Sequence, residues 1–176
     1  MEYRPLGSTG LNVSEIGFGC GNVGGLMIRG EHGDQVKAVA RAMELGINYF
    51  DTAPSYGDGV SETNLGRVLK ELSADVYVGT KFRVTTHEPG RIKSNVIASV
   101  EESLARLQRE QVDLMQMHNH VAAATDGESV TPEETLGEVV DALQELREEG
   151  KVRFWGMTAV GAVSYTHLTL PTKRIV

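Results

Sequence analysis

Four residues of this sequence carry side chains that could act together on a proton: Asp51, Tyr56, Lys81 and His118. A tyrosine phenol has a pKa of about 10, so it is a poor acid at pH 7. A lysine ammonium about 4 Å away would stabilise the phenolate by about 4 kcal/mol at an effective dielectric constant of about 20. Desolvation opposes this effect unless the ammonium stays charged, which a paired carboxylate ensures. The set is therefore suited to giving a proton to an oxygen that gains negative charge.

Carbonyl reduction needs such a proton, because hydride arrives at the carbon while a proton arrives at the oxygen. His118 could hydrogen-bond that oxygen and orient the substrate. None of the four side chains can donate hydride, so the hypothesis requires a nicotinamide cofactor. A simpler structural interpretation also exists, in which Asp51 caps a turn and Tyr56 packs against its neighbours.

Strand-like and helix-like segments alternate along the chain. Residues 3–14 contain two turn signals and predict a hairpin. Short apolar segments predict strands at 16–20, 47–50, 76–78, 112–117 and 152–157. Amphipathic periodicity predicts helices at 34–43, 61–72, 92–107 and 132–149, with Leu136 on the apolar stripe of the last one. Residues 122–131 predict a polar loop. This order implies parallel strands joined by helical crossovers, either in an open doubly wound sheet or in a (β/α) barrel.

Polar residues follow four of the predicted strands: Asp51, Lys81, His118 and Thr158. Four unrelated caps would be the simplest explanation. In barrel enzymes, however, the catalytic residues come from the carboxyl ends of several strands and converge on one face. Aspartate, lysine and histidine are titratable, and one at each strand end is what a shared pocket needs. The order of the chain therefore predicts that these residues lie together.

Two other motifs suggest different sites. Gly19, Gly21 and Gly24 fit the G-x-G-x-x-G pattern of a dinucleotide-binding turn. That turn should open a helix at once, whereas here the next helix is predicted only from residue 34, so a flexible loop is the better interpretation. His118 and His120 flank one residue and could share a metal ion, but no spacing links them to further ligands. A metal-dependent barrel hydrolase is therefore a weaker alternative.

The composition is that of one domain with a hydrophobic core, because 40% of the 176 residues are hydrophobic. The formal net charge of −7 offers no general attraction for nucleic acid or for an anionic membrane. No apolar run is long enough to span a bilayer, and the first residues lack the apolar region of a signal peptide. The single cysteine, Cys20, cannot form an internal disulfide, so a cytoplasmic protein is predicted.

Several segments of the chain resemble the aldo-keto reductase family. They are residues 6–14, 46–57, 61–66, 78–81, 113–118 and 150–156. The resemblance implies a (β/α)8 barrel that reduces aldehydes and ketones with NADPH, or less often with NADH. It also implies that Tyr56 is the general acid, supported by Asp51, Lys81 and His118.

For the cofactor, the resemblance implies contacts from Gly19 and Cys20 at the end of the first strand, with Asp51 near the nicotinamide ribose. The family usually has Ser-Asn after the fifth strand, where this chain has Thr158-Ala159. Threonine keeps the hydroxyl, whereas alanine lacks the amide that would hold the nicotinamide. A non-catalytic, cofactor-binding barrel that serves as a sensor or subunit therefore stays an alternative.

A complete barrel has eight strand–helix units in about 250 residues. Residues 1–160 are therefore expected to form the N-terminal part of such a barrel, with about five strands and four helices after the hairpin. Residues 164–176 lack helical periodicity, and residues 161–176 are expected to be a non-native or disordered tail. We expect the fragment to be inactive alone, whereas the family acts on small-molecule carbonyl substrates.

Overall fold

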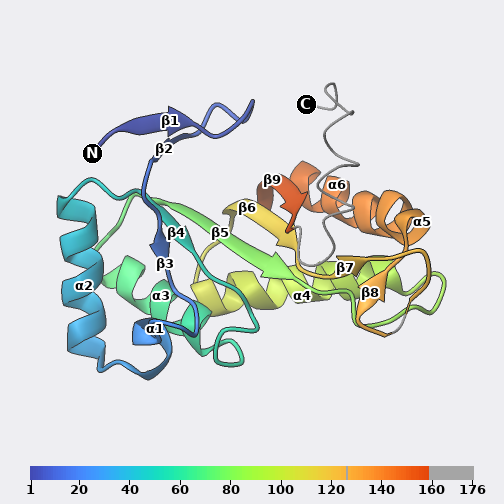
Figure 1. Cartoon of the computed structure of the whole chain (residues 1–176), viewed down its shortest axis with the longest axis horizontal. Helices are drawn as coiled ribbons and strands as arrows, with labels where there is room; N and C mark the ends of the chain where they lie inside the picture. The colour runs from blue at the N-terminus through green and yellow to red at the C-terminus, as the bar shows by residue number, and fades with distance from the viewer. Residues whose placement is uncertain (126, 159–176) are drawn as a thin grey trace.

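The computed structural model describes residues 1–125 and 127–158. Its centre is a five-stranded parallel sheet in the order β3-β4-β5-β6-β9 (Figure 1). The strands are β3 (Phe18–Gly19), β4 (Tyr49–Asp51), β5 (Tyr77–Phe82), β6 (Val112–Met117) and β9 (Val152–Met157). Each strand pairs with the next one of this sheet along the chain, without the reversal of order that marks a doubly wound sheet. The predicted parallel sheet is confirmed, and its order is that of a partial barrel.

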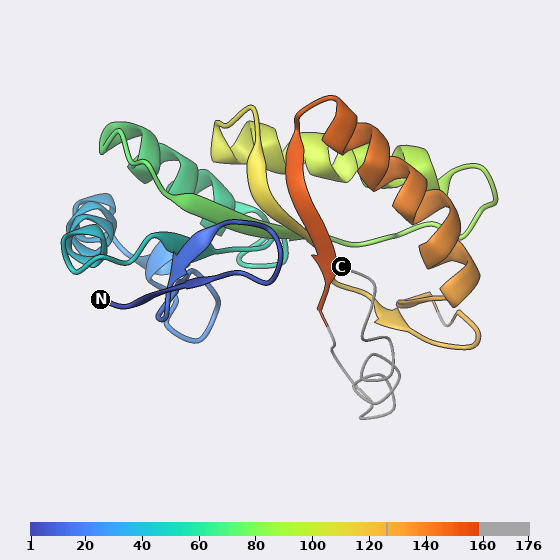
Figure 2. The ribbon, with the colours of Figure 1, turned by 90° about the horizontal axis from the view of Figure 1, so that it is seen from above.

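Helices connect these strands and lie along one face of the sheet (Figure 2). They are α2 (His32–Glu44), α3 (Val60–Glu71), α4 (Ile92–Leu107) and α6 (Val140–Glu148). On the other face, Leu114, Gln116 and Phe154 are only partly buried. This second face corresponds to the inner wall of a barrel, whereas the helices form the outer layer.

The hydrophobic core fills the space between the sheet and the helices. Phe50 of β4 and Val78 of β5 are paired across the sheet and fully buried, as are Leu65 of α3 and Val100 of α4. Because side chains alternate between the two faces of a strand, Asp51 and Gly79 next to this pair face the inner wall. The packing of the core therefore decides which polar side chains reach the inner face.

A glycine allows two of the outer helices to approach closely. A Cβ atom at Gly66 of α3 would lie 2.4 Å from the carbonyl oxygen of Leu107, the last residue of α4. The amino end of α4 is held by Glu138, whose carboxylate accepts hydrogen bonds from the backbone N–H groups of Gly90 at 2.9 Å and Lys93 at 3.1 Å. These contacts order the helices behind the sheet.

Several short elements complete the described part. Strands β1 (Tyr3–Pro5) and β2 (Asn12–Ser14) pair in antiparallel fashion, which confirms the predicted hairpin. Strands β7 (His120–Val121) and β8 (Ser129–Val130) form a small parallel pair. Strand β8 lies within the predicted polar loop at 122–131, and β7 directly precedes that loop. A short helix α5 (Pro132–Glu134) and a π-helical turn, η1 (Thr135–Val139), precede α6.

Two polar residues predicted to follow a strand lie inside one. Asp51 is the last residue of β4, and Lys81 is the fifth of the six residues of β5. The predicted strand at 76–78 was too short, because it omitted Gly79, which is paired with β4 and β6, and Thr80, which is paired with β6. The predicted strand at 16–20 was too long, since only Phe18 and Gly19 are paired as a strand.

Two helix predictions were wrong in detail. A helical turn, α1 (Leu26–Arg29), lies in the segment that was predicted to be a loop up to residue 34. The predicted helix 132–149 is interrupted by the π-helical turn, in which Gly137 has non-helical dihedral angles. A π turn rotates the residues before it relative to those after it, and Leu136, predicted on the buried stripe, is 76% exposed.

The predicted boundary at residue 160 and the predicted tail lie outside the described residues. Within residues 1–125 and 127–158, no helix is both long and apolar enough to cross a membrane.

Candidate active site

The site is organised around the side chain of Lys81, which enters from β5 and is only 6% exposed. Its Nζ atom donates hydrogen bonds to Asp51 Oδ1 at 2.7 Å, to the carbonyl oxygen of Thr52 at 2.8 Å and, more weakly, to Tyr56 Oη at 3.4 Å. An ammonium has three protons to donate, so these contacts use all of them. A buried charge is stable only when it is paired and hydrogen-bonded, and Lys81 meets both conditions.

The register of the sheet places Asp51 beside Lys81. Asp51 is paired with Gly79, and Lys81 lies two residues further along the same strand, so both side chains emerge on the inner face. Gly79 offers no side chain that could separate them. The predicted proximity of the carboxylate and the ammonium therefore follows from strand pairing.

A tight loop after β4 places Tyr56 next to Lys81. The loop turns at Gly57, Asp58 and Gly59, which have φ angles of +64°, +57° and +82°, a region that favours glycine. The ring of Tyr56 lies with its centroid 5.0 Å from Lys81 Nζ, within the range of a cation–π contact. Lys81 therefore touches both the hydroxyl and the ring of this tyrosine.

Tyr56 also borders an open cavity of about 410 Å³, which it shares with Gly19, Gly21, Asn22, Val23 and Gly24. A Cβ atom at Gly21 would lie 3.6 Å from the Tyr56 ring. The glycine-rich loop that resembled a dinucleotide-binding turn thus lies against the candidate acid. Its low side-chain volume leaves one side of the tyrosine accessible.

His118 follows β6 directly, and its backbone N–H donates to the carbonyl oxygen of Phe82 at 2.9 Å. Its side chain and Lys81 border the same cavity of about 250 Å³. Burial, and then the charges of Lys81 and Arg83, hold the pKa of His118 below its ordinary value. The imidazole is therefore neutral at pH 7, with one nitrogen that can donate a hydrogen bond.

The residues predicted to bind the cofactor differ in which of their groups are accessible. Gly19 is paired with Asp51 and lies in open space on the cavity that Tyr56 borders. The thiol of Cys20 is buried, and this burial, with a further effect of Asp51, raises its pKa to about 12. The Thr158 hydroxyl donates to the carbonyl oxygen of Met117 at 3.2 Å, at the carboxyl end of β6.

These features allow a test of whether a nicotinamide cofactor fits. A flat ring needs an accessible surface beside the proton donor and polar groups near its ribose. Gly19 supplies surface without a side chain, and the Asp51 side chain is 33% exposed. The residues therefore fit a nicotinamide cofactor, although the buried thiol of Cys20 leaves only its backbone for a contact.

Some residues of the site could not be inferred from the sequence. The carbonyl of Thr52 is a partner of Lys81, and a backbone oxygen has no sequence signal. Asn119 is buried and its amide bonds the backbone of Val84 and the carbonyl of Glu128, which links the loops after β5 and β6. Its place next to His118 at a strand end was the available signal.

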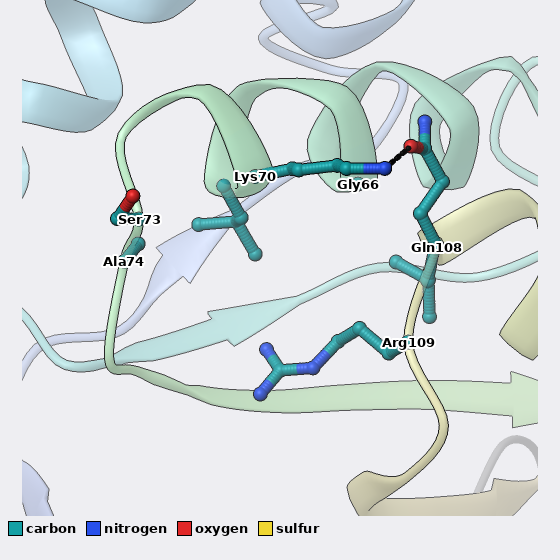
Figure 3. A pocket seen from close by; sticks show the side chains of 8 residues that line it. Gly66, Lys70, Ser73, Ala74, Gln108 and Arg109 are labelled. Atoms are coloured by element: carbon teal, nitrogen blue, oxygen red, sulfur yellow. Dashed lines mark hydrogen bonds between the residues drawn. The ribbon is translucent and has the colours of Figure 1, made fainter.

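Another cavity, of about 300 Å³, lies between the carboxyl ends of α3 and α4 (Figure 3). Lys70 crosses it and donates to Gln108 Oε1 at 3.2 Å. These helix ends lie near the amino ends of the strands, so this cavity is remote from Lys81. In the part of the chain that the structure describes, no group of three or more His, Cys, Asp or Glu residues is arranged to hold a metal ion.

Comparisons with known proteins agree with the fold. Residues 15–175 match the sequence profile of the aldo/keto reductase family. The chain is 38% identical to L-galactose dehydrogenase of Arabidopsis thaliana over 178 aligned residues, which cover 96% of the chain and 51% of that protein. The chain spans about half the length of the curated relatives that it matches.

Solved structures give the same result. An aldo-keto reductase from Bacillus halodurans in its holo form has a TM-score of 0.75 and 29% identity, with 100% of this chain and 56% of that chain covered. An aldo-keto reductase from Klebsiella pneumoniae, solved in complex with NADPH, has a TM-score of 0.68. The two sequences are 24% identical, and the match covers 92% of this chain and 51% of that chain. At this low identity, the match supports the fold alone. By the family match, by the relatives and by the parallel strand order, this chain belongs to the aldo/keto reductase family.

Proposed function

We propose that this chain carries the proton-transfer machinery of an NADPH-dependent reductase of aldehydes and ketones, with Tyr56 as the general acid. The observation that carries the proposal is the position of Lys81 Nζ between Asp51 Oδ1 and Tyr56 Oη. A positive charge at this point stabilises the phenolate that remains when the proton has left. Family membership supports an oxidoreductase.

Each polar group has a separate task in this proposal. Tyr56 donates its proton to the carbonyl oxygen of the substrate, and Lys81 stabilises the oxygen that gives up this proton. Asp51 keeps Lys81 charged within a largely buried setting. His118, neutral because burial and neighbouring cations lower its pKa, donates a hydrogen bond to the substrate oxygen without competing as an acid.

The cofactor is NADPH, or NADH, and it supplies the hydride that no side chain can provide. Gly19 would hold the nicotinamide side of the site open, and Asp51 would face the ribose. The hydroxyl of Thr158 would lie at the neighbouring strand end, where the resemblance expects a serine. The proposed substrates are small carbonyl compounds that fit above Tyr56 and His118.

The proposal is tested by following NADPH oxidation with a nitrobenzaldehyde in a full-length protein that contains this chain, because the 176-residue fragment is expected to be inactive alone. We expect Tyr56→Phe to lower kcat by about 10²- to 10⁴-fold, because the general acid is removed. Tyr3→Phe is the matched control, since Tyr3 lies on the exposed hairpin and its hydroxyl donates to the Gly46 carbonyl oxygen. Equal turnover of the Tyr56 variant and the control would refute Tyr56 as the acid.

The non-catalytic alternative, a barrel that binds cofactor as a sensor or subunit, makes a different prediction. It requires NADPH binding, measured by fluorescence, without turnover of any carbonyl compound. The buried and fully paired Lys81 argues against it, because a binding role alone would not require an ammonium beside a tyrosine hydroxyl.

A further inference from the structure

Two pairs of buried polar side chains lie directly behind the site. Thr52 Oγ1 and Ser61 Oγ are 2.9 Å apart, and Thr80 Oγ1 donates to Glu62 Oε1 at 2.6 Å. All four residues have 0% exposure. Burying polar groups is costly unless each is hydrogen-bonded, so the first turn of α3 holds an ordered polar network.

Each pair contains a threonine that is next in the sequence to Asp51 or Lys81, the two residues of the ion pair. Thr52 follows Asp51, and its carbonyl oxygen also accepts a hydrogen bond from Lys81 Nζ. Thr80 precedes Lys81 in β5. Two consecutive residues of α3, Ser61 and Glu62, therefore hydrogen-bond the threonines next to the two charged residues.

The direction of the hydrogen bonds in the first pair is determined. Ser61 Oγ donates its only proton to the carbonyl oxygen of Cys20 at 2.9 Å. Thr52 must then donate to Ser61, because a hydroxyl has a single proton. Ser61 thus joins the chain after β3 and the chain after β4 to the same helical turn.

The second pair is held by a charge from another helix. Glu62 Oε2 accepts a hydrogen bond from Arg106 Nε of α4 at 2.7 Å. This partner stabilises the carboxylate, which would otherwise be a buried, unpaired charge. Glu62 of α3 and Arg106 of α4 together therefore fix the position of Thr80 and of the part of β5 next to Lys81.

We infer that Ser61 and Glu62 are positioning residues, which set the distances from Lys81 to Asp51 and Tyr56 by holding Thr52 and Thr80. Tyr56 Oη lies 3.4 Å from Lys81 Nζ, near the outer limit of a hydrogen bond. A small displacement of β4 or β5 would therefore break this contact first. For its effect on turnover, the inference rests on the proposed function, but its structural part does not.

The structural part is tested with the single thiol of the chain. Cys20 is buried, and its carbonyl is held by Ser61. We expect Ser61→Ala to raise the rate of Cys20 labelling by a disulfide reagent about tenfold, because one buried hydrogen bond that closes this segment is lost. Thr63→Ala is the control, since the Thr63 hydroxyl donates to the carbonyl oxygen of Gly59, the N-cap of the same helix. If the labelling rate follows the urea unfolding equilibrium in both variants, Ser61 has no local role and the inference fails.

The positioning of Lys81 is tested with threonine variants of matched shape. Thr80→Val removes the hydroxyl that Glu62 holds, whereas Thr80→Ser keeps it. We expect the NMR signal of the Lys81 ammonium, protected by burial and three contacts, to be lost by exchange in the valine variant and retained in the serine variant. Equal ammonium signals in both variants would overturn the inference, whether or not the protein reduces carbonyl compounds.

If carbonyl reduction is found, the same variants separate positioning from general stability. We expect Thr80→Val to lower kcat by about tenfold or more with an unchanged KM for NADPH, because misplaced catalytic groups slow chemistry rather than binding. Thr80→Ser should restore kcat. A change in KM alone, or no rescue by serine, would contradict a positioning role.

Discussion

Lys81 Nζ lies 2.7 Å from Asp51 Oδ1, and the lysine side chain is far more buried than the aspartate, at 6% against 33% exposure. The ammonium therefore depends on the carboxylate more than the reverse, because Asp51 can also be solvated. Asp51 therefore stabilises the positive charge of Lys81, and the Lys81 ammonium in turn contacts the Tyr56 hydroxyl.

Replacing Asp51 by asparagine should destabilise the fold, since Asp51 is the charged group among the three hydrogen-bond partners of the Lys81 ammonium. We expect a loss of about 2 kcal/mol in the free energy of unfolding, less than for a fully buried pair because Asp51 reaches solvent. Urea denaturation measures this change. Asp34→Asn, which removes an exposed pair with Lys37, should cost less than about 1 kcal/mol; equal losses would contradict the dependence of Lys81 on Asp51.

Cys20 should react slowly with thiol reagents in the folded protein. Its pKa is raised to about 12 by burial and by Asp51, and only the thiolate is nucleophilic. A free cysteine with a pKa of about 8.5 should therefore label far faster at pH 8. Labelling kinetics with and without urea measure the difference. Rapid labelling of the folded protein would show that this segment is open.

Glu138 should make the stability of the fold depend on acid pH. Hydrogen bonds from the backbone N–H groups of Gly90 and Lys93 lower the pKa of its carboxyl. Its stabilising effect is then present above the unfolded pKa of about 4.3 and is lost as pH falls through the lower folded pKa. Glu138→Gln should flatten this part of the stability profile, measured by urea denaturation between pH 5 and 3. The exposed Glu133→Gln should leave the profile unchanged.

Gly66→Ala should destabilise the protein, because the added Cβ would lie 2.4 Å from the Leu107 carbonyl oxygen of the facing helix. We expect a loss of about 1–3 kcal/mol, typical of overpacking. Gly33→Ala in α2 is the matched control, since a Cβ there has nothing within 4 Å. That variant should be more stable by about 0.5–1 kcal/mol from helix propensity. A stabilising effect of alanine at both positions would contradict the close contact of α3 and α4.

Strands β3 and β9 are the outer strands of the described sheet, and we expect the 176-residue chain to associate through them. On β9, Trp155 and Met157 are 36% and 49% exposed. Met157→Lys should reduce association, because a charge on an edge strand disfavours pairing with another chain. Sedimentation velocity at several concentrations measures the effect. A monomer with cooperative melting, unaffected by this variant, would contradict the prediction.

Much of the fold follows from local patterns. The predicted bounds of the helix at 92–107 and of the strands at 112–117 and 152–157 are those observed. These segments have a clear period and are bounded by turns or charged residues, so neighbouring residues suffice to define them. The shorter strands at 16–20 and 76–78 were misjudged, because their pairing depends on residues far away in the chain.

The direction of individual side chains could not be predicted in the same way. The sequence suggested Leu136 in the core, whereas its side chain is exposed. A single π-helical turn changes which residues face inward. That effect is not encoded in the spacing of a few residues.

By itself, the sequence determined the alternation of strands and helices and the family, and it suggested the candidate set Asp51, Tyr56, Lys81 and His118, because these depend on residue type and order. Only the tertiary structure decided that Lys81 is held by Asp51, Thr52 and Tyr56, and that Ser61 and Glu62 hold the strands behind it. The reason is physical: hydrogen bonds between buried groups that are distant in sequence form only when the sheet and α3 pack together, and no local pattern specifies their partners.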